Sequence, residues 1–90
     1  MITVVATGGF DPIHSGHIHY LKEASLSGTR LIVGVNSDEW LIRKKGKYFM
    51  PWEERAAIVR ELACVDEVIS FDDSDNSAIH ALETVKLLHP

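Results

Sequence analysis

Three short apolar runs separate longer amphipathic segments along the chain. The runs cover residues 2–7, 31–35 and 65–71, and the first is nearly all apolar and β-branched without clean alternation. Such a pattern is typical of strands that are buried on both faces, as in a parallel sheet. The sequence therefore predicts three strands, with a right-handed crossover from the first to the second.

The segment after the first run has helical spacing, because Ile18, Leu21 and Ala24 share one face. Its start is ambiguous. Asp11 could cap the helix with Pro12 at the first helical position, or Ser15 could cap it instead.

Three further helices follow from the same kind of spacing and from capping residues. One is expected from Ser37 to about Ile42, one from Pro51 onward, and one from Ala78 to Leu88, capped by the polar turn at 72–77. Residues 44–49 contain Gly46 and have no strong period, so a mobile loop is expected there.

Apart from the short helical piece at 37–42, the order is strand–helix–strand–helix–strand–helix, which predicts an α/β fold with a doubly wound parallel sheet. We expect one domain over residues 1–90. The chain stops at His89-Pro90, and a proline just past a helix normally leads to another element. Together with the small number of strands, this suggests that the 90 residues are the N-terminal part of a longer domain.

The composition fits a globular protein, with 46% apolar and 24% charged residues. The formal charge of -4 argues against general binding to nucleic acid or to anionic membranes. No run is long enough to span a bilayer and no signal-peptide pattern is present, so a cytoplasmic protein is expected. Four of the nine basic residues nevertheless lie within positions 43–47, which leaves room for a local basic site.

The stretch from Gly8 to His17 carries the main candidate chemistry. A glycine-rich turn follows the first strand, and His14 and His17 lie where the helix begins. In open parallel sheets, ligands bind beyond the carboxyl ends of the strands, and a helix start offers unpaired N–H groups to an anion. Histidines at this position can add proton donors or positive charge where a phosphate would lie.

The string Gly9-Phe10-Asp11-Pro12-Ile13-His14-Ser15-Gly16-His17 resembles the H-x-G-H signature of the cytidylyltransferase-like nucleotidyltransferases. The likeness continues through residues 34–39, the basic residues within positions 43–47, Glu54-Arg55 and residues 65–68. Within the family, the sequence looks most similar to glycerol-3-phosphate cytidylyltransferases and to adenylyltransferases that activate a heptose phosphate.

This resemblance implies a Rossmann-like nucleotidyltransferase that moves CMP, or less readily AMP, from CTP or ATP to a phosphorylated polyol, sugar or alcohol. Pyrophosphate would leave, and no covalent intermediate would form. A Mg²⁺ ion bound mainly to phosphate oxygens and a homodimer are also implied. Neither a nucleic acid nor a membrane is expected as a partner.

The resemblance also implies roles for individual residues. Catalysis is expected from His14, His17 and Lys44. The nucleotide is expected to contact Thr7, Gly8, Gly9, Phe10, Asp11, Ser15, Gly16 and Arg55. The phosphorylated substrate is expected to contact Lys44, Lys47 and Asp38.

Several of these residues have structural alternatives. Arg55 falls on the inward face of its helix, where a guanidinium is costly without an anionic partner, and Asp66 or Glu54 could supply one. Asp11 and Asp38 could each be helix caps.

The sequence also departs from the family pattern. Gly46 stands where cytidylyltransferase relatives often have lysine, and Ala63 stands where some relatives have arginine. The family's later segment, an arginine followed by a serine- and threonine-rich stretch, is absent from the 90 residues. A non-catalytic module for nucleotide binding or dimerisation therefore stays open as an alternative.

Overall fold

A parallel three-stranded sheet forms the middle of the structure, a computed structural model that describes residues 1–89. The strands β1 (Thr3–Gly8), β2 (Arg30–Val35) and β3 (Glu67–Ile69) lie in the order β1-β2-β3. Both pairs are parallel, as predicted. β2 is central and its last five residues are buried, which explains why its sequence is apolar without alternation.

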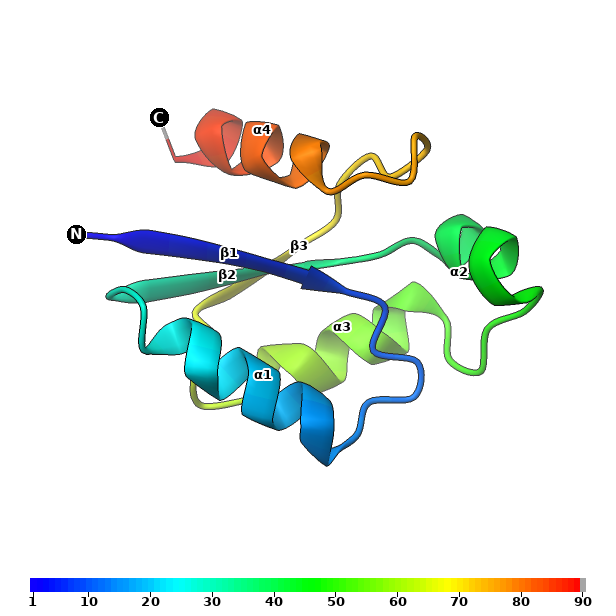
Figure 1. Cartoon of the computed structure of the whole chain (residues 1–90), viewed down its shortest axis with the longest axis horizontal. Helices are drawn as coiled ribbons and strands as arrows, with labels where there is room; N and C mark the ends of the chain where they lie inside the picture. Colours follow the sequence, from blue (N-terminus) through cyan, green and yellow to red (C-terminus); the bar gives the residue numbers. More distant parts are fainter. Residues whose placement is uncertain (90) are drawn as a thin grey trace.

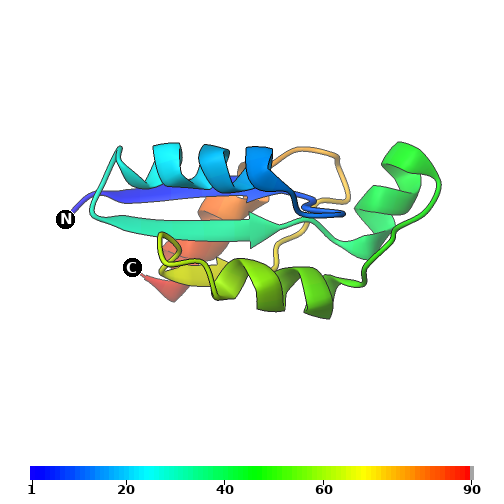
Figure 2. The ribbon, with the colours of Figure 1, turned by 90° about the horizontal axis from the view of Figure 1, so that it is seen from below.

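Four helices surround this sheet (Figure 1). α1 (Ser15–Ser25) and α3 (Trp52–Arg60) lie side by side on one face, as Figures 1 and 2 both show. α4 (Ile79–Leu88) lies on the other face, and α2 (Asp38–Lys45) stands beyond the carboxyl ends of the strands. Helices therefore cover both faces of the sheet, and the predicted doubly wound α/β architecture is confirmed.

The hydrophobic core lies between the sheet and the layer of α1 and α3. Leu21 from α1, Val33 from β2 and Val59 from α3 are fully buried in it. Phe10 is only 2% exposed, so the loop after β1 sends one large side chain into the core. Gly8 permits this packing, because a Cβ there would lie 2.9 Å from the Phe10 ring. The loop that carries the candidate chemistry is thus anchored in the core.

Two predicted boundaries were wrong at α1 and α2. The N-cap of α1 is His14, so neither Asp11 nor Ser15 caps that helix. α2 continues to Lys45 and ends at Gly46, whose φ of 84° gives a left-handed C-cap. Lys44 and Lys45 therefore belong to a helix rather than to a mobile loop.

The third strand and the last helix are shorter than predicted. The Asp66 side chain accepts a hydrogen bond from the Leu31 backbone N at 2.7 Å, just before β3 begins. β3 then covers only three residues. α4 begins at Ile79, one residue later than predicted. Ala78 provides no side-chain cap, but Ser77 of the polar turn accepts a hydrogen bond from the Ile79 backbone N at 3.4 Å.

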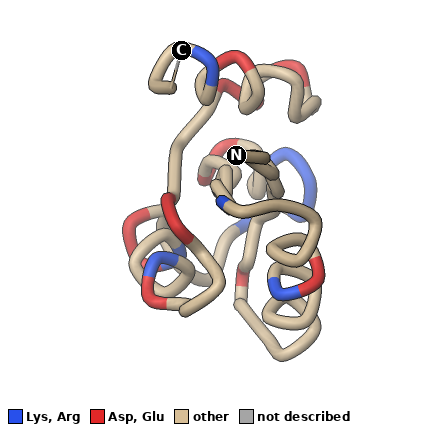
Figure 3. The backbone as a smooth tube through the Cα atoms, turned by 90° about the vertical axis from the view of Figure 1, so that its left-hand side faces the viewer, with Lys and Arg blue, Asp and Glu red and all other residues tan. Residues whose placement is uncertain are grey.

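Charged residues are distributed over several elements. In Figure 3, Lys and Arg occupy short separate stretches instead of one continuous stripe. Within residues 1–89, no helix combines the length and the apolar composition that crossing a bilayer requires.

Candidate functional site

A cavity of about 520 Å³ opens between the β1–α1 loop and α2, beyond the carboxyl end of β1. We call it the histidine cavity. Its walls are formed by Gly9, Phe10, Asp11, Pro12, His14, His17, Trp40, Leu41, Lys44 and Lys45. The structure thus brings the predicted catalytic residues His14, His17 and Lys44 to one place, together with Gly9, Phe10 and Asp11.

The two histidines form a stacked pair with fixed orientation. Their ring centroids lie 3.8 Å apart with an interplanar angle of 27°. Nδ1 of His14 accepts a hydrogen bond from the Gly16 backbone N at 3.1 Å, and Nδ1 of His17 accepts one from the His14 backbone N at 3.1 Å. This reciprocal arrangement forms a capping box at the start of α1.

These hydrogen bonds determine which ring nitrogen of each histidine carries the proton. A nitrogen that accepts a hydrogen bond is unprotonated, so in the neutral ring the proton is on Nε2. Burial and the neighbouring His14 lower the pKa of His17 below its ordinary value of 6.5. His17 is therefore a neutral Nε2–H donor near pH 7, at the N-terminus of α1, where the positive end of the helix dipole favours an anion.

Asp11 fastens the β1–α1 loop to the connection between α2 and α3. Its carboxylate accepts hydrogen bonds from the backbone N of Phe49 and of Met50, each at 2.8 Å, and lies 3.1 Å from Nζ of Lys45. Burial alone would raise the pKa of Asp11, but the two backbone bonds and Lys45 outweigh it and lower the pKa. This geometry gives Asp11 a role in fixing the loop.

Arg55 is fully buried beneath the loop, and each of its side-chain nitrogens donates to the protein. Nε donates to the Met50 carbonyl at 2.9 Å, and Nη1 donates to the carbonyls of Gly9 and Asn36 at 2.8 and 2.7 Å. Nη2 donates to Oδ1 of Asp38 at 2.6 Å. The guanidinium therefore joins the ends of β1 and β2 to α2 and α3.

This geometry corrects the expected partner of Arg55 and bears on its expected role. Its anionic partner is Asp38 rather than Asp66 or Glu54. Arg55 is also outside the lining of the histidine cavity, so its position favours holding the loop over the expected direct contact with a nucleotide. The inward position predicted by helical spacing was correct, because the side chain has no exposed surface.

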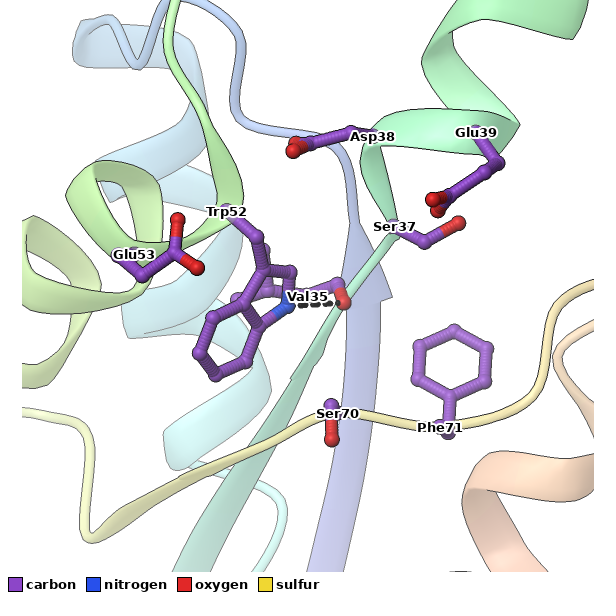
Figure 4. A pocket seen from close by; sticks show the side chains of 8 residues that line it. All are labelled: Val35, Ser37, Asp38, Glu39, Trp52, Glu53, Ser70 and Phe71. Atoms are coloured by element: carbon purple, nitrogen blue, oxygen red, sulfur yellow. Dashed lines mark hydrogen bonds between the residues drawn. The ribbon is translucent and has the colours of Figure 1, made fainter.

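Asp38 lies on a different pocket from the one that holds the histidines. Ser37, rather than Asp38, caps α2, because its hydroxyl accepts a hydrogen bond from the Trp40 backbone N. Asp38 instead pairs with Arg55 and lines a pocket of about 270 Å³, shown in Figure 4. Its expected contact with the substrate is therefore not favoured by this placement.

This second pocket, which we call the acidic pocket, is lined by Val35, Ser37, Asp38, Glu39, Trp52, Glu53, Ser70 and Phe71. Figure 4 shows Trp52 beside the end of β2, where its Nε1 donates to the Val35 carbonyl at 2.9 Å. Of the three carboxylates in the acidic pocket, Asp38 is paired with Arg55, and the charges of Glu39 and Glu53 would repel a phosphate. No group of three or more His, Cys, Asp or Glu within residues 1–89 is arranged to hold a metal ion.

The remaining predicted residues lie outside the lining of the histidine cavity. Thr7 borders a separate groove between β1 and α4, and its carbonyl accepts a hydrogen bond from the Tyr20 hydroxyl at 3.3 Å. Gly16 supports the His14 ring through its backbone N, while Ser15 is exposed at the first position of α1. Lys47 is exposed, with Nζ 5.5 Å from the centre of the Phe49 ring.

Sequence reasoning favours packing for Trp40 over a place in the substrate pocket, expects Lys45 to be only exposed and gives Leu41 no role. All three line the cavity. Nζ of Lys44 lies 4.7 Å from the centre of the Trp40 ring. The available signal was helical spacing, since residues 40, 41 and 44 share one face of a helix. That signal was missed because α2 was expected to end near Ile42.

The amino-acid sequence is similar to those of known proteins. The model of the family described as "Cytidylyltransferase-like" matches residues 5–90. The bifunctional protein HldE of Syntrophotalea carbinolica is 40% identical over 91 residues, which cover 98% of this chain and 18% of HldE. The FAD synthase of Pyrococcus abyssi is 41% identical over 90 residues, which cover 99% of this chain and 58% of that enzyme.

A solved structure is also similar over the whole chain. The crystal structure of the lipopolysaccharide core biosynthesis protein from Thermoplasma volcanium GSS1 has a TM-score of 0.83 and 37% sequence identity. The similarity covers 100% of this chain and 70% of that one. The curated relatives HldE and FAD synthase are longer, and this chain spans 18% and 58% of their lengths.

Proposed function

The chain belongs to the cytidylyltransferase-like family, and we propose that it acts as a nucleotidyltransferase on a phosphorylated small molecule. The nucleotide donor is CTP or ATP, and the acceptor is a phosphorylated polyol, sugar or alcohol. The observation that carries this proposal is the stacked His14–His17 pair, held with both Nδ1 atoms as acceptors at the edge of a basic cavity.

The reaction joins two phosphates. An oxygen of the acceptor phosphate attacks the α-phosphorus of the nucleoside triphosphate, and the bond from that phosphorus to the bridging oxygen of pyrophosphate breaks. A phosphate dianion needs no base to become a nucleophile, so the enzyme contributes position and charge stabilisation more than proton transfer.

Residues of the histidine cavity match these needs. The Nε2–H groups of His14 and His17 donate to phosphate oxygens, where charge increases as pyrophosphate leaves. Lys44 adds a positive charge from α2 on the opposite wall, and within residues 1–89 it forms no ion pair that would neutralise it. Arg55 holds the Gly9 carbonyl, and through it the loop, at a fixed distance from β2.

Mg²⁺ is part of the proposal because it neutralises phosphate charge in such reactions. Asp11 is the carboxylate of the histidine cavity, and its oxygens already accept from Phe49, Met50 and Lys45. This engagement supports an ion held by phosphate oxygens and water rather than by Asp11.

A homodimer is proposed with this function. Half-exposed apolar side chains on neighbouring helices support it, since Ile18 on α1 and Ile58 on α3 are 39% and 38% exposed. Sedimentation velocity on the purified protein tests this, and a monomer at micromolar concentration would contradict it.

The activity is tested by measuring pyrophosphate release with CTP or ATP and a panel of phosphorylated acceptors. The panel includes glycerol 3-phosphate, ribose 5-phosphate and mannose 6-phosphate, with FMN as a flat-ringed alternative. Release that requires both substrates is expected. Nucleotide binding without release would instead identify a nucleotide-binding module and overturn the enzymatic proposal.

A pair of variants on α1 tests the role of the histidines. His17→Ala removes one donor that acts on the transition state, so kcat is expected to fall about 10²–10³-fold with little change in nucleotide affinity. His19→Ala is the matched control, because the His19 side chain is 78% exposed on the same helix. Equal loss of kcat and affinity in His17→Ala would indicate a ground-state binding role.

A further inference from the structure

A second cavity adjoins the histidine cavity and has not been assigned to any part of the reaction. It has a volume of about 250 Å³ and is lined by Trp40, Arg43, Lys44 and Asn76. We call it the Arg43 cavity. Trp40 and Lys44 line both cavities, so these two side chains form a shared wall between them.

Arg43 is held in a defined orientation at this cavity. Its Nε donates to Oδ1 of Asn76 at 3.1 Å, and its Nη2 donates to the Asp73 carbonyl at 2.8 Å. The third nitrogen, Nη1, donates to no group within residues 1–89, and the side chain is 40% exposed. The guanidinium thus retains donors for a ligand while its position is fixed by the loop that follows β3.

Asn76 presents a second donor. Its Oδ1 accepts from Arg43, so the amide Nδ2 is the polar atom left for a ligand. Its backbone has φ of 63° and donates to the Asp73 carbonyl at 2.9 Å. These contacts orient Asn76 relative to Arg43 before any ligand arrives.

Asp73 anchors the whole arrangement to the end of β2. It is 4% exposed, and its carboxylate accepts hydrogen bonds from the Ser37 hydroxyl at 2.7 Å and from Nδ2 of Asn36 at 3.1 Å. The loop after β3 is therefore tied to the start of α2. Donors that are fixed in advance lose little entropy when they bind a ligand.

We propose that the Arg43 cavity binds the body of the acceptor and that Arg43 and Asn76 select it. This inference rests on the proposed function, because it places the acceptor phosphate at Lys44, next to the histidines. Guanidinium, ammonium and amide donors suit a ligand rich in hydroxyl and phosphate oxygens. A volume below the usual range of about 300–1,000 Å³ for ligand sites favours a small polyol or sugar phosphate over a large flat acceptor.

The kinetic test compares Arg43→Gln with Arg60→Gln in the full chain. Arg43→Gln removes a charged donor, so the KM for the acceptor is expected to rise about tenfold or more, while the KM for the nucleotide changes less than about twofold. Arg60 is exposed on α3 and lines neither cavity, so Arg60→Gln should behave like the wild type. An equal rise in both KM values, or no rise for the acceptor, would overturn the inference.

Calorimetry supplies a readout that does not depend on turnover. Glycerol 3-phosphate, ribose 5-phosphate, mannose 6-phosphate and FMN are titrated into the wild type, Arg43→Gln and Asn76→Gly; glycine tolerates the positive φ of residue 76. Binding of a polyol or sugar phosphate that both variants weaken supports the inference, even if no pyrophosphate is released and the proposed function fails. Binding of none of them, binding of FMN alone, or binding that neither variant weakens overturns it.

Discussion

The histidine cavity and the acidic pocket lie at the same end of the same sheet, yet they carry opposite charge. The first combines two imidazole donors with Lys44, while Asp11 in its wall is already paired with Lys45. The second is lined by three carboxylates from α2 and α3. Topology places both beyond strand ends, so topology alone does not decide where a phosphate binds. The charged side chains decide where a phosphate binds.

The buried pair of Arg55 and Asp38 connects these two regions. Asp38 lines the acidic pocket, and Arg55 donates both to Asp38 and to the carbonyl of Gly9 in the wall of the histidine cavity. This end of the sheet thus contains two kinds of cation. Arg55 is buried and used by the protein, whereas Lys44 is exposed and available to a ligand.

Replacing the buried cation should have the largest effect on stability. Arg55→Met removes the hydrogen bonds to Gly9, Asn36 and Met50 and leaves the Asp38 carboxylate without its partner. The free energy of unfolding, measured in urea, is expected to fall by about 3–5 kcal/mol.

Arg60→Met is the matched control for that measurement. Arg60 lies on the same helix with an exposed side chain, so its substitution should change the unfolding free energy by less than about 0.5 kcal/mol. Similar values for the two variants would show that Arg55 does not hold the loop, and the distinction between the two cations would fail.

Replacing Lys44, the exposed cation, should weaken substrate binding and have little effect on stability. Lys44→Met removes a charge from the histidine cavity but no hydrogen bond or ion pair that the structure describes within residues 1–89. It loses only the contact with the Trp40 ring and a positive charge in the last turn of α2, so the free energy of unfolding should fall by less than about 1 kcal/mol. The KM for one or both substrates, measured from initial rates of pyrophosphate release, should rise about tenfold, because a charged contact to phosphate is lost. A large loss of stability with unchanged KM would contradict this assignment.

A substitution in the acidic pocket should have the smallest effect on nucleotide binding and stability. Glu53→Gln removes one of its carboxylates, and the affinity for a nucleoside triphosphate in calorimetry should change less than about twofold at 0.15 M salt, because screening is effective beyond about 8 Å. Loss of a negative charge from the first turn of α3 should lower stability by only about 0.3–1 kcal/mol. A tenfold gain in affinity would show that the nucleotide lies at this pocket instead.

The sequence predicted where the strands and the β1–α1 loop lie, but not all of the contacts that hold this loop in place. Periodicity identified the strands and the inward position of Arg55, because both depend on spacing along one element. It did not identify Asp38 as the partner of Arg55, since that contact joins residues on different helices. Distances between elements depend on tertiary packing, which spacing within one element does not describe.

The predicted start of α1 and the predicted end of α2 were both wrong because of the residues that cap these helices. The capping role of His14 was missed because Asp, Ser, Asn and Thr are the usual N-caps, whereas here an imidazole nitrogen accepts the hydrogen bond. The predicted end of α2 is too early because the lack of periodicity around Gly46 favours a loop from Lys44 onward. Gly46 is instead the left-handed C-cap that allows the helix to include Lys44. That extension puts Lys44 on the wall of the cavity.

The pH dependence of His17 follows from its environment. Its pKa is lowered, chiefly by burial, so folding favours the neutral ring. Its contribution to stability is full above the ordinary value of 6.5 and is lost as the pH falls through the lowered value in the folded protein. Protonation of Nδ1 would also break the hydrogen bond from the His14 backbone N.

The role of the two histidines is tested most directly by ¹⁵N NMR of the His14 and His17 rings, with and without a non-hydrolysable nucleoside triphosphate and Mg²⁺. At pH 7 we expect the proton of His17 on Nε2, and we expect the Nε2 signals of both rings to shift when the analogue binds while the Nδ1 signals change little. A proton on Nδ1 of either neutral ring, or Nε2 signals that do not respond to a bound analogue, would contradict the claim that this pair holds the phosphates.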